Sequence, residues 1–126
     1  MRRLKLLVAI RSETDRELIR AYLAPADYLL VFAMSGTEAV DTLLFNPGFD
    51  LVLADVSMAV SNGTAISAVI RKYNPYIPLI GMTAYPVDWV LKQNGGPGVD
   101  RWLMKPFKRQ ELEIAVWKLI TKVASA

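Results

Sequence analysis

The sequence predicts a three-layer α/β domain, with a five-stranded parallel sheet and helices on both of its faces. Five short apolar runs alternate along the chain with five segments of helical periodicity. Helices that join parallel strands make right-handed crossovers, and this arrangement covers both faces of the sheet. The run Leu-Val-Leu-Ala at residues 51–54 has no polar position, which is typical of a strand buried on both faces.

Each element has a local signal. The strands are expected at residues 4–10, 28–33, 51–55, 77–82 and 99–104. The first two helices begin at capping-box patterns opened by Ser12 and Ser35, whose hydroxyls can accept from first-turn amides. Pro25 ends the first of these helices. Further helices are expected after Gly63, at residues 87–93 and at residues 109–123.

Composition limits the class of protein. The 126 residues suit one domain spanning residues 1–126, and 53% hydrophobic with 21% charged residues indicate a folded chain. No apolar run approaches the 18 residues of a membrane-spanning helix, and the apolar segment at residues 6–10 is too short for a signal peptide. We therefore expect a cytoplasmic protein with no membrane partner.

The chain has no Cys and no His. This excludes disulfides, zinc sites built on thiolate or imidazole, Cys and Ser-His nucleophiles, and histidine phosphotransfer through this chain. The formal net charge is +3, and the basic residues are scattered without a stripe of interleaved aromatic residues. We therefore expect no direct binding of nucleic acid.

The polar residues that matter for function follow the strands. The carboxyl ends of parallel strands gather along one edge of the sheet, where open α/β domains bind their ligands. The residues expected at this edge are Ile10 and Arg11, Asp55, Thr83, and Lys105. For an isolated Asp55 the simpler interpretation is a residue that starts a turn. An acid, a hydroxyl and an amine at three neighbouring strand ends favour a shared site instead.

These segments resemble the receiver domain of two-component response regulators, a CheY-like, flavodoxin-like fold. The resemblance runs from about residue 4 to residue 123. It is carried by D-L-V-L-A-D ending in Asp55 with Gly63 eight residues later, by I-G-M-T-A with Thr83, and by W-L-M-K-P-F with Lys105. Each motif alone is weak, but the three in this order are specific.

The resemblance implies a role for each residue in a phosphorelay. Asp55 would accept a phosphoryl group from a sensor histidine kinase or phosphotransfer protein, with a carboxylate oxygen as nucleophile. Thr83 would bond one phosphoryl oxygen and Lys105 another, and the Lys105-Pro106 peptide would be cis. Ser57 would supply a loop carbonyl, and its side chain would affect the lifetime of the phosphoryl group. The chain would be no enzyme beyond self-phosphorylation and dephosphorylation at Asp55.

The first strand end departs from the receiver pattern. Receivers usually carry two acids there, which help to hold Mg²⁺, whereas this chain has Ile10 and Arg11. With one carboxylate left at Asp55 and a guanidinium beside it, Mg²⁺ binding is disfavoured. We expect Arg11 to neutralise Asp55 in place of the metal; the alternative is that Arg11 points to solvent. Compensation by Glu13 or Asp15, the nearby carboxylates, is less favoured, because helix capping explains Asp15 more simply.

Three tryptophans are candidates for the switch and for a partner surface. Trp102, three residues before Lys105, occupies the place of the receiver switch aromatic, although it could simply fill a gap. Trp89 and Trp117 are expected to be exposed and, with Trp102, to form a face for an effector or for a second copy of the chain.

The sequence leaves two alternative functions to consider. One is a degenerate pseudo-receiver that acts as a phosphorylation-independent interaction module. The other, a flavodoxin-like cofactor binder, is disfavoured because the loop at residues 12–14 has no glycine and carries acidic neighbours.

Overall fold

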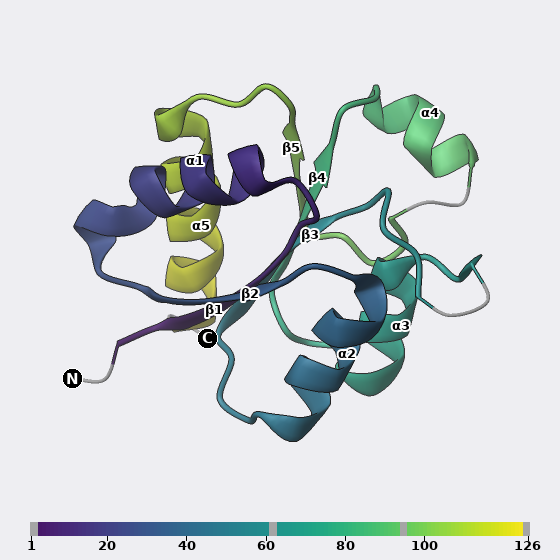
Figure 1. The fold of residues 1–126 in the computed structure, drawn as a ribbon, viewed down its shortest axis with the longest axis horizontal. Coiled ribbons are helices and arrows are strands. Elements are labelled where there is room, and N and C mark those ends of the chain that lie inside the picture. The colour runs from purple at the N-terminus through teal and green to yellow at the C-terminus, as the bar shows by residue number, and fades with distance from the viewer. Residues whose placement is uncertain (1–2, 61–62, 94–95, 125–126) are drawn as a thin grey trace.

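A five-stranded parallel sheet with the strand order β2-β1-β3-β4-β5 forms the centre of the molecule (Figure 1). The computed structural model describes residues 3–60, 63–93 and 96–124. The strands are β1 (Lys5–Ala9), β2 (Leu29–Ala33), β3 (Leu51–Asp55), β4 (Leu79–Thr83) and β5 (Arg101–Met104). The predicted fold class and all five predicted strands are confirmed.

Five α-helices connect and follow the strands. They are α1 (Glu13–Leu23), α2 (Gly36–Phe45), α3 (Ile66–Tyr73), α4 (Val87–Lys92) and α5 (Arg109–Ala124). The hydroxyls of Ser12 and Ser35 accept hydrogen bonds from the third residue of their helices, as the capping patterns predict. Pro25 lies in a short 3₁₀ turn, η1 (Ala24–Ala26), directly after α1. No helix in the described part of the chain is long and apolar enough to span a bilayer.

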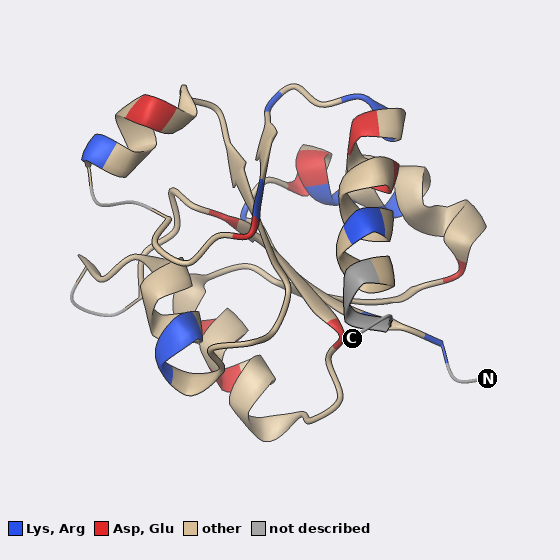
Figure 2. Ribbon diagram, turned by 180° about the vertical axis from the view of Figure 1, so that it is seen from behind, with Lys and Arg blue, Asp and Glu red and all other residues tan. Residues whose placement is uncertain are grey.

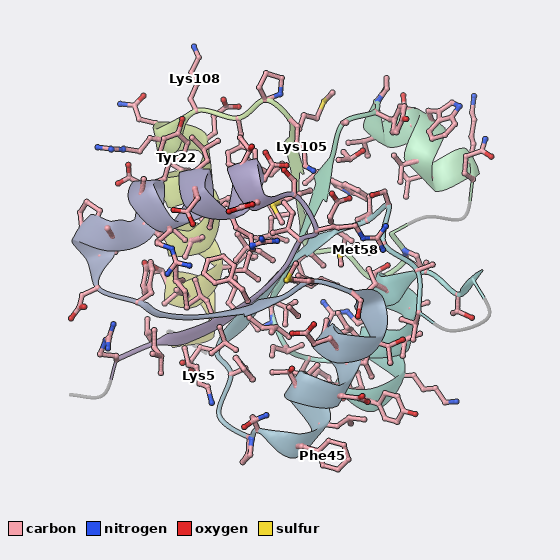
Figure 3. The ribbon with its side chains drawn as sticks, viewed as in Figure 1. Lys5, Tyr22, Phe45, Met58, Lys105 and Lys108 are labelled. Atoms are coloured by element: carbon pink, nitrogen blue, oxygen red, sulfur yellow. The ribbon has the colours of Figure 1, made fainter. Side chains whose placement is uncertain are left out.

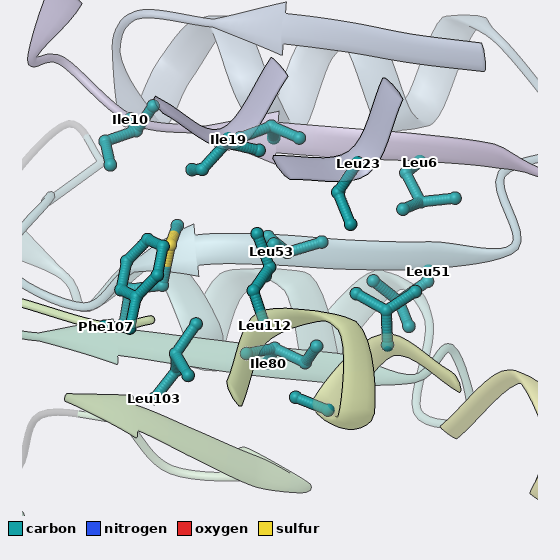
Figure 4. Close-up of a cluster of buried hydrophobic side chains, with 14 of the residues drawn as sticks. Leu6, Ile10, Ile19, Leu23, Leu51, Leu53, Ile80, Leu103, Phe107 and Leu112 are labelled. Carbon is teal, nitrogen blue, oxygen red and sulfur yellow. The ribbon is translucent and has the colours of Figure 1, made fainter. Parts of the chain in front are cut away.

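The helices lie on two sides of the sheet. In Figure 1, α1 and α5 lie together on one side, and α2 and α3 lie together on the other. Side chains alternate along a strand, so Leu6, Val8 and Ile10 join the core beneath α1 and α5 (Figure 4), whereas Leu7 and Ala9 join the core beneath α2 and α3. Each side of the sheet therefore has its own hydrophobic core.

The ends of β4 and β5 are tied to each other and to β3 by the backbone. The amide of Lys105 donates to the carbonyl of Thr83 at 2.7 Å, and the amide of Val56 donates to the carbonyl of Met82 at 3.0 Å. Figure 2 shows Lys and Arg interspersed with Asp and Glu over the helices, with further charged residues on the strands and loops. The strand ends are therefore held in a fixed register where the chain leaves the sheet.

Candidate functional site

A cavity of about 700 Å³ opens at the carboxyl edge of the sheet. Asp55 at the end of β3, Thr83 at the end of β4 and Lys105 directly after β5 all line it. The loop after β3 contributes Met58, and α4 contributes Trp89. The convergence of acid, hydroxyl and amine expected from the strand ends is therefore present in the structure.

The Asp55 carboxylate is bonded on both oxygens. Lys105 Nζ lies 2.6 Å from Oδ2, while the amide and hydroxyl of Ser57 donate to Oδ1 at 2.9 and 2.6 Å. The hydrogen bond from the Ser57 amide, two residues after Asp55, closes the type of turn that an Asp side chain favours. Asp55 thus both starts a turn and belongs to a shared site. The sequence analysis expected the Ser57 side chain to affect the phosphoryl group, but it did not predict this hydroxyl bond to the Asp55 carboxylate.

Charge and burial act together on the pKa values of the pair. Burial opposes ionisation of Asp55, but the Lys105 ammonium and the two Ser57 donors outweigh it and hold the pKa of Asp55 below its usual value. Burial also disfavours the charged form of Lys105, yet the carboxylates of Asp55 and Asp15 raise its pKa. The site is therefore an ion pair at neutral pH.

Thr83 is buried and its hydroxyl is held by the next loop. Its Oγ1 accepts from the amide of Tyr85 at 2.9 Å and donates to the carbonyl of Tyr85 at 3.1 Å. The ring of Tyr85 packs against that of Trp89, with centroids 4.9 Å apart. Thr83 therefore lines the cavity while its hydroxyl fixes the start of the β4–α4 connection. The Lys105-Pro106 peptide beside it is cis, as the resemblance implied.

The two residues at the end of β1 do not form part of the charged cluster. Ile10 is fully buried in the core on the α1 side, next to Ile19 and near Phe107 (Figure 4). Arg11 is exposed, and within the described residues it makes no ion pair with Asp55. The expected Arg11–Asp55 pair is therefore wrong, because the Arg11 side chain is exposed and Lys105, directly after β5, brings its ammonium to this carboxylate instead.

A second carboxylate, which sequence reasoning set aside, does reach the site. Asp15 Oδ2 lies 3.2 Å from Lys105 Nζ. Figure 3 shows Lys105 beside the strand ends and the first turn of α1, from which Asp15 comes. The signal that could have found Asp15 is its place in the first turn of the helix after β1, since that turn starts at the edge where the strand ends gather.

The three tryptophans occupy different surroundings. Trp89 is half exposed at the cavity, and Trp117, the more exposed, lines a separate hollow of about 290 Å³ with Leu23 and Tyr28. Trp102 is partly buried, and its ring covers Gly96 so closely that a Cβ there would lie 2.3 Å from it. Trp89 and Trp117 are exposed as expected, and they line hollows that share no residue. The partner face predicted from the three tryptophans stays a prediction.

The fold, with Asp55, Thr83 and Lys105 gathered at the carboxyl edge of its sheet, is that of a known family of signalling domains. The model of the response regulator receiver domain matches residues 11–117, and the chain belongs to that family. It is a receiver domain of two-component signalling. Receiver domains interact with histidine kinases and effector domains in two-component systems.

Two solved structures are similar over almost the whole chain. The signal receiver domain of an HD domain-containing protein from Pseudomonas fluorescens has a TM-score of 0.84 and 26% identity, covering 99% of this chain and 100% of its own. A receiver domain protein from Clostridium thermocellum has a TM-score of 0.81 and 27% identity, covering 96% and 97%.

Curated relatives are longer proteins. The transcriptional regulatory protein ResD from Bacillus subtilis (strain 168) is 29% identical over 120 residues, which are 95% of this chain and 49% of that protein. The chain spans about half or less of the length of the first curated relatives that it matches.

Proposed function

We propose that this domain accepts a phosphoryl group on Asp55 from the phosphohistidine of a sensor kinase or phosphotransfer protein. In this step an oxygen of the Asp55 carboxylate bonds to phosphorus and the P–N bond to the donor imidazole breaks. The imidazole nitrogen keeps the electron pair and takes up a proton, and the product is an aspartyl phosphate. The observation that carries the proposal is the 2.6 Å contact between Asp55 and Lys105 in a cavity that Thr83 also lines.

The local geometry supports a role for each neighbour. The ammonium group of Lys105 can neutralise charge on an incoming phosphoryl oxygen. Electrostatic stabilisation of this kind is a main contribution of a protein to phosphoryl transfer. A Thr83 hydroxyl that donated to a phosphoryl oxygen would have to give up its bond to the Tyr85 carbonyl, because a hydroxyl has one donor. Phosphorylation would then loosen the connection that carries the Tyr85–Trp89 ring contact, and this is how the site would signal to a partner.

A divalent cation fits the donor set poorly. Mg²⁺ requires near-octahedral oxygen ligands and usually one or two free carboxylates. Both oxygens of Asp55 are engaged, and the Asp15 and Asp55 carboxylates share the Lys105 ammonium. The residues that the structure describes include no group of three or more His, Cys, Asp or Glu that could hold a metal. We therefore propose that Mg²⁺-dependent phosphorylation is impaired.

Two measurements test this proposal. The first is intact mass after incubation with a small phosphodonor, with and without Mg²⁺. We expect a slow gain of one phosphoryl group that is absent in Asp55→Asn. The second is a Mg²⁺ titration followed by tryptophan fluorescence, in which saturation in the micromolar to low-millimolar range would contradict impaired metal binding.

The second candidate function is a phosphorylation-independent interaction module. The engagement of both Asp55 oxygens favours it, because a nucleophile must give up bonds to react. A complete lack of adduct with any donor, combined with partner binding that is unchanged in Asp55→Asn, would support this alternative. The partners proposed are an effector domain or protein at the Tyr85–Trp89 side of the cavity, or a second copy of the chain.

A further inference from the structure

The carboxylate of Asp15 is used differently from its counterpart in the next helix. Asp15 and Glu38 are both the third residue of a helix that begins after a serine cap, and both donate an amide to that serine hydroxyl. Glu38 turns its carboxylate back to the chain, where it accepts from the amide of Met34 at 3.3 Å. Asp15, shorter by one methylene, points its carboxylate at Lys105 instead.

We infer that Asp15 is a positioning residue for the acceptor site: it holds the Lys105 ammonium beside Asp55, so that this ammonium serves as the resident cation of the site. The inference rests on the proposed phosphoryl transfer to Asp55. Lys105 Nζ lies between carboxylates from two separate elements, at 2.6 Å from Asp55 on β3 and 3.2 Å from Asp15 on α1. An ammonium has three donors, so one remains for a phosphoryl oxygen.

Asp15 matters because the other carboxylate that holds the Lys105 ammonium, that of Asp55, is altered during the reaction. Lysine has a long flexible stem and loses much rotamer freedom when its end is fixed. When an oxygen of Asp55 bonds to phosphorus, the carboxylate that holds the ammonium at 2.6 Å is consumed. A second anchor on α1 does not react, so it keeps Lys105 in place throughout the transfer.

The charge of Asp15 gives this role a recognisable signature. The cluster of Asp15, Asp55 and Lys105 has a net charge of −1 when all three are ionised, which opposes an anionic phosphodonor. Removal of the Asp15 charge should therefore improve donor affinity and lower KM, while the loss of the anchor lowers kcat. Substitution of a residue that served only to stabilise the fold would not lower KM and kcat together.

The test uses the full chain in four forms: wild type, Asp15→Asn, Asp15→Glu, and the matched control Glu13→Gln. Glu13 is exposed in the same helical turn, and it makes no ion pair with Lys105 within the described residues. Circular dichroism and urea unfolding establish that each form is folded. The first readout is the rate at which an amine-acylating reagent modifies Lys105, measured by peptide mass spectrometry, which needs no phosphorylation.

In this readout we expect Asp15→Asn to raise the acylation rate of Lys105 by about two- to fivefold, the range for loss of a partly exposed ion pair. Glu13→Gln should leave the rate unchanged, and Asp15→Glu should restore most of the protection. Equal Lys105 rates in Asp15→Asn and Glu13→Gln overturn the inference.

The second readout is labelling by acetyl phosphate, with EDTA and with Mg²⁺. We expect Asp15→Asn to lower kcat by about tenfold, the effect of losing a residue that positions a reacting group. KM should fall as well, and both changes should be the same with EDTA and with Mg²⁺. Strong Mg²⁺ stimulation of the wild type that disappears in Asp15→Asn would make Asp15 a metal ligand and overturn the inference. If no form gains an adduct while Lys105 protection still depends on Asp15, the proposed function fails and the anchoring of Lys105 stands.

Discussion

The Asp55–Lys105 pair should make a measurable contribution to stability, and a double-mutant cycle can isolate it. The perturbations are Asp55→Asn, Lys105→Met and the two together. At 2.6 Å the gross attraction is about 6 kcal/mol at an effective dielectric near 20. Desolvation offsets much of this, because the side chains of Asp55 and Lys105 are only 13% and 20% exposed. We expect a net coupling of about 1–3 kcal/mol.

The single substitutions should not cost the same. Lys105→Met leaves the Asp55 carboxylate largely buried with only its Ser57 bonds, and should cost about 2–3 kcal/mol, somewhat less than for a fully buried charge. Asp55→Asn should cost less, because Lys105 keeps Asp15 as a partner. Urea unfolding at pH 7 measures each value, provided that the denaturant slope stays constant across the four proteins.

The coupling should depend on pH in a defined direction. The folded-state pKa of Asp55 is lowered, so its stabilisation is complete above the unfolded pKa of about 3.9 and disappears as the pH falls through the folded value. The folded-state pKa of Lys105 is raised, so its stabilisation is complete below about 10.4 and disappears as the pH rises through the folded value. A coupling below about 0.5 kcal/mol at pH 7 would refute the reasoning, as would a coupling that survives full protonation of Asp55.

Two further substitutions test the loops that shape the site. Gly36→Ala should lower the free energy of unfolding by about 1–3 kcal/mol, because the added Cβ would lie 2.4 Å from the carbonyl oxygen of Ala59 in the loop after β3. An unchanged midpoint of urea unfolding would mean that this loop shifts at little cost. Thr83→Val should cost about 1–2 kcal/mol by removing both bonds to Tyr85. It should also change the emission of Trp89 in a background without the other tryptophans, and an identical spectrum would argue against coupling between the hydroxyl and the ring pair.

The sequence alone determined the architecture and the centre of the site. Alternation of apolar runs with helical periodicity dictates a parallel sheet, and in such a sheet the carboxyl ends of the strands share one edge. The sequence therefore predicts that Asp55, Thr83 and Lys105 meet at this edge. These predictions succeeded because they depend on which strand a residue ends, and not on the direction of a single side chain.

Only the tertiary structure decided which charge reaches Asp55. The pleat of β1 turns Ile10 into the core beneath α1 and leaves Arg11 exposed, so adjacency in sequence did not bring Arg11 to the site. The docking of α1 on the sheet sets the direction of Asp15, and the long stem of Lys105 allows its ammonium to span the distance between Asp15 and Asp55. Helix phase and side-chain reach depend on packing between elements distant in the chain, and local sequence patterns do not contain that information.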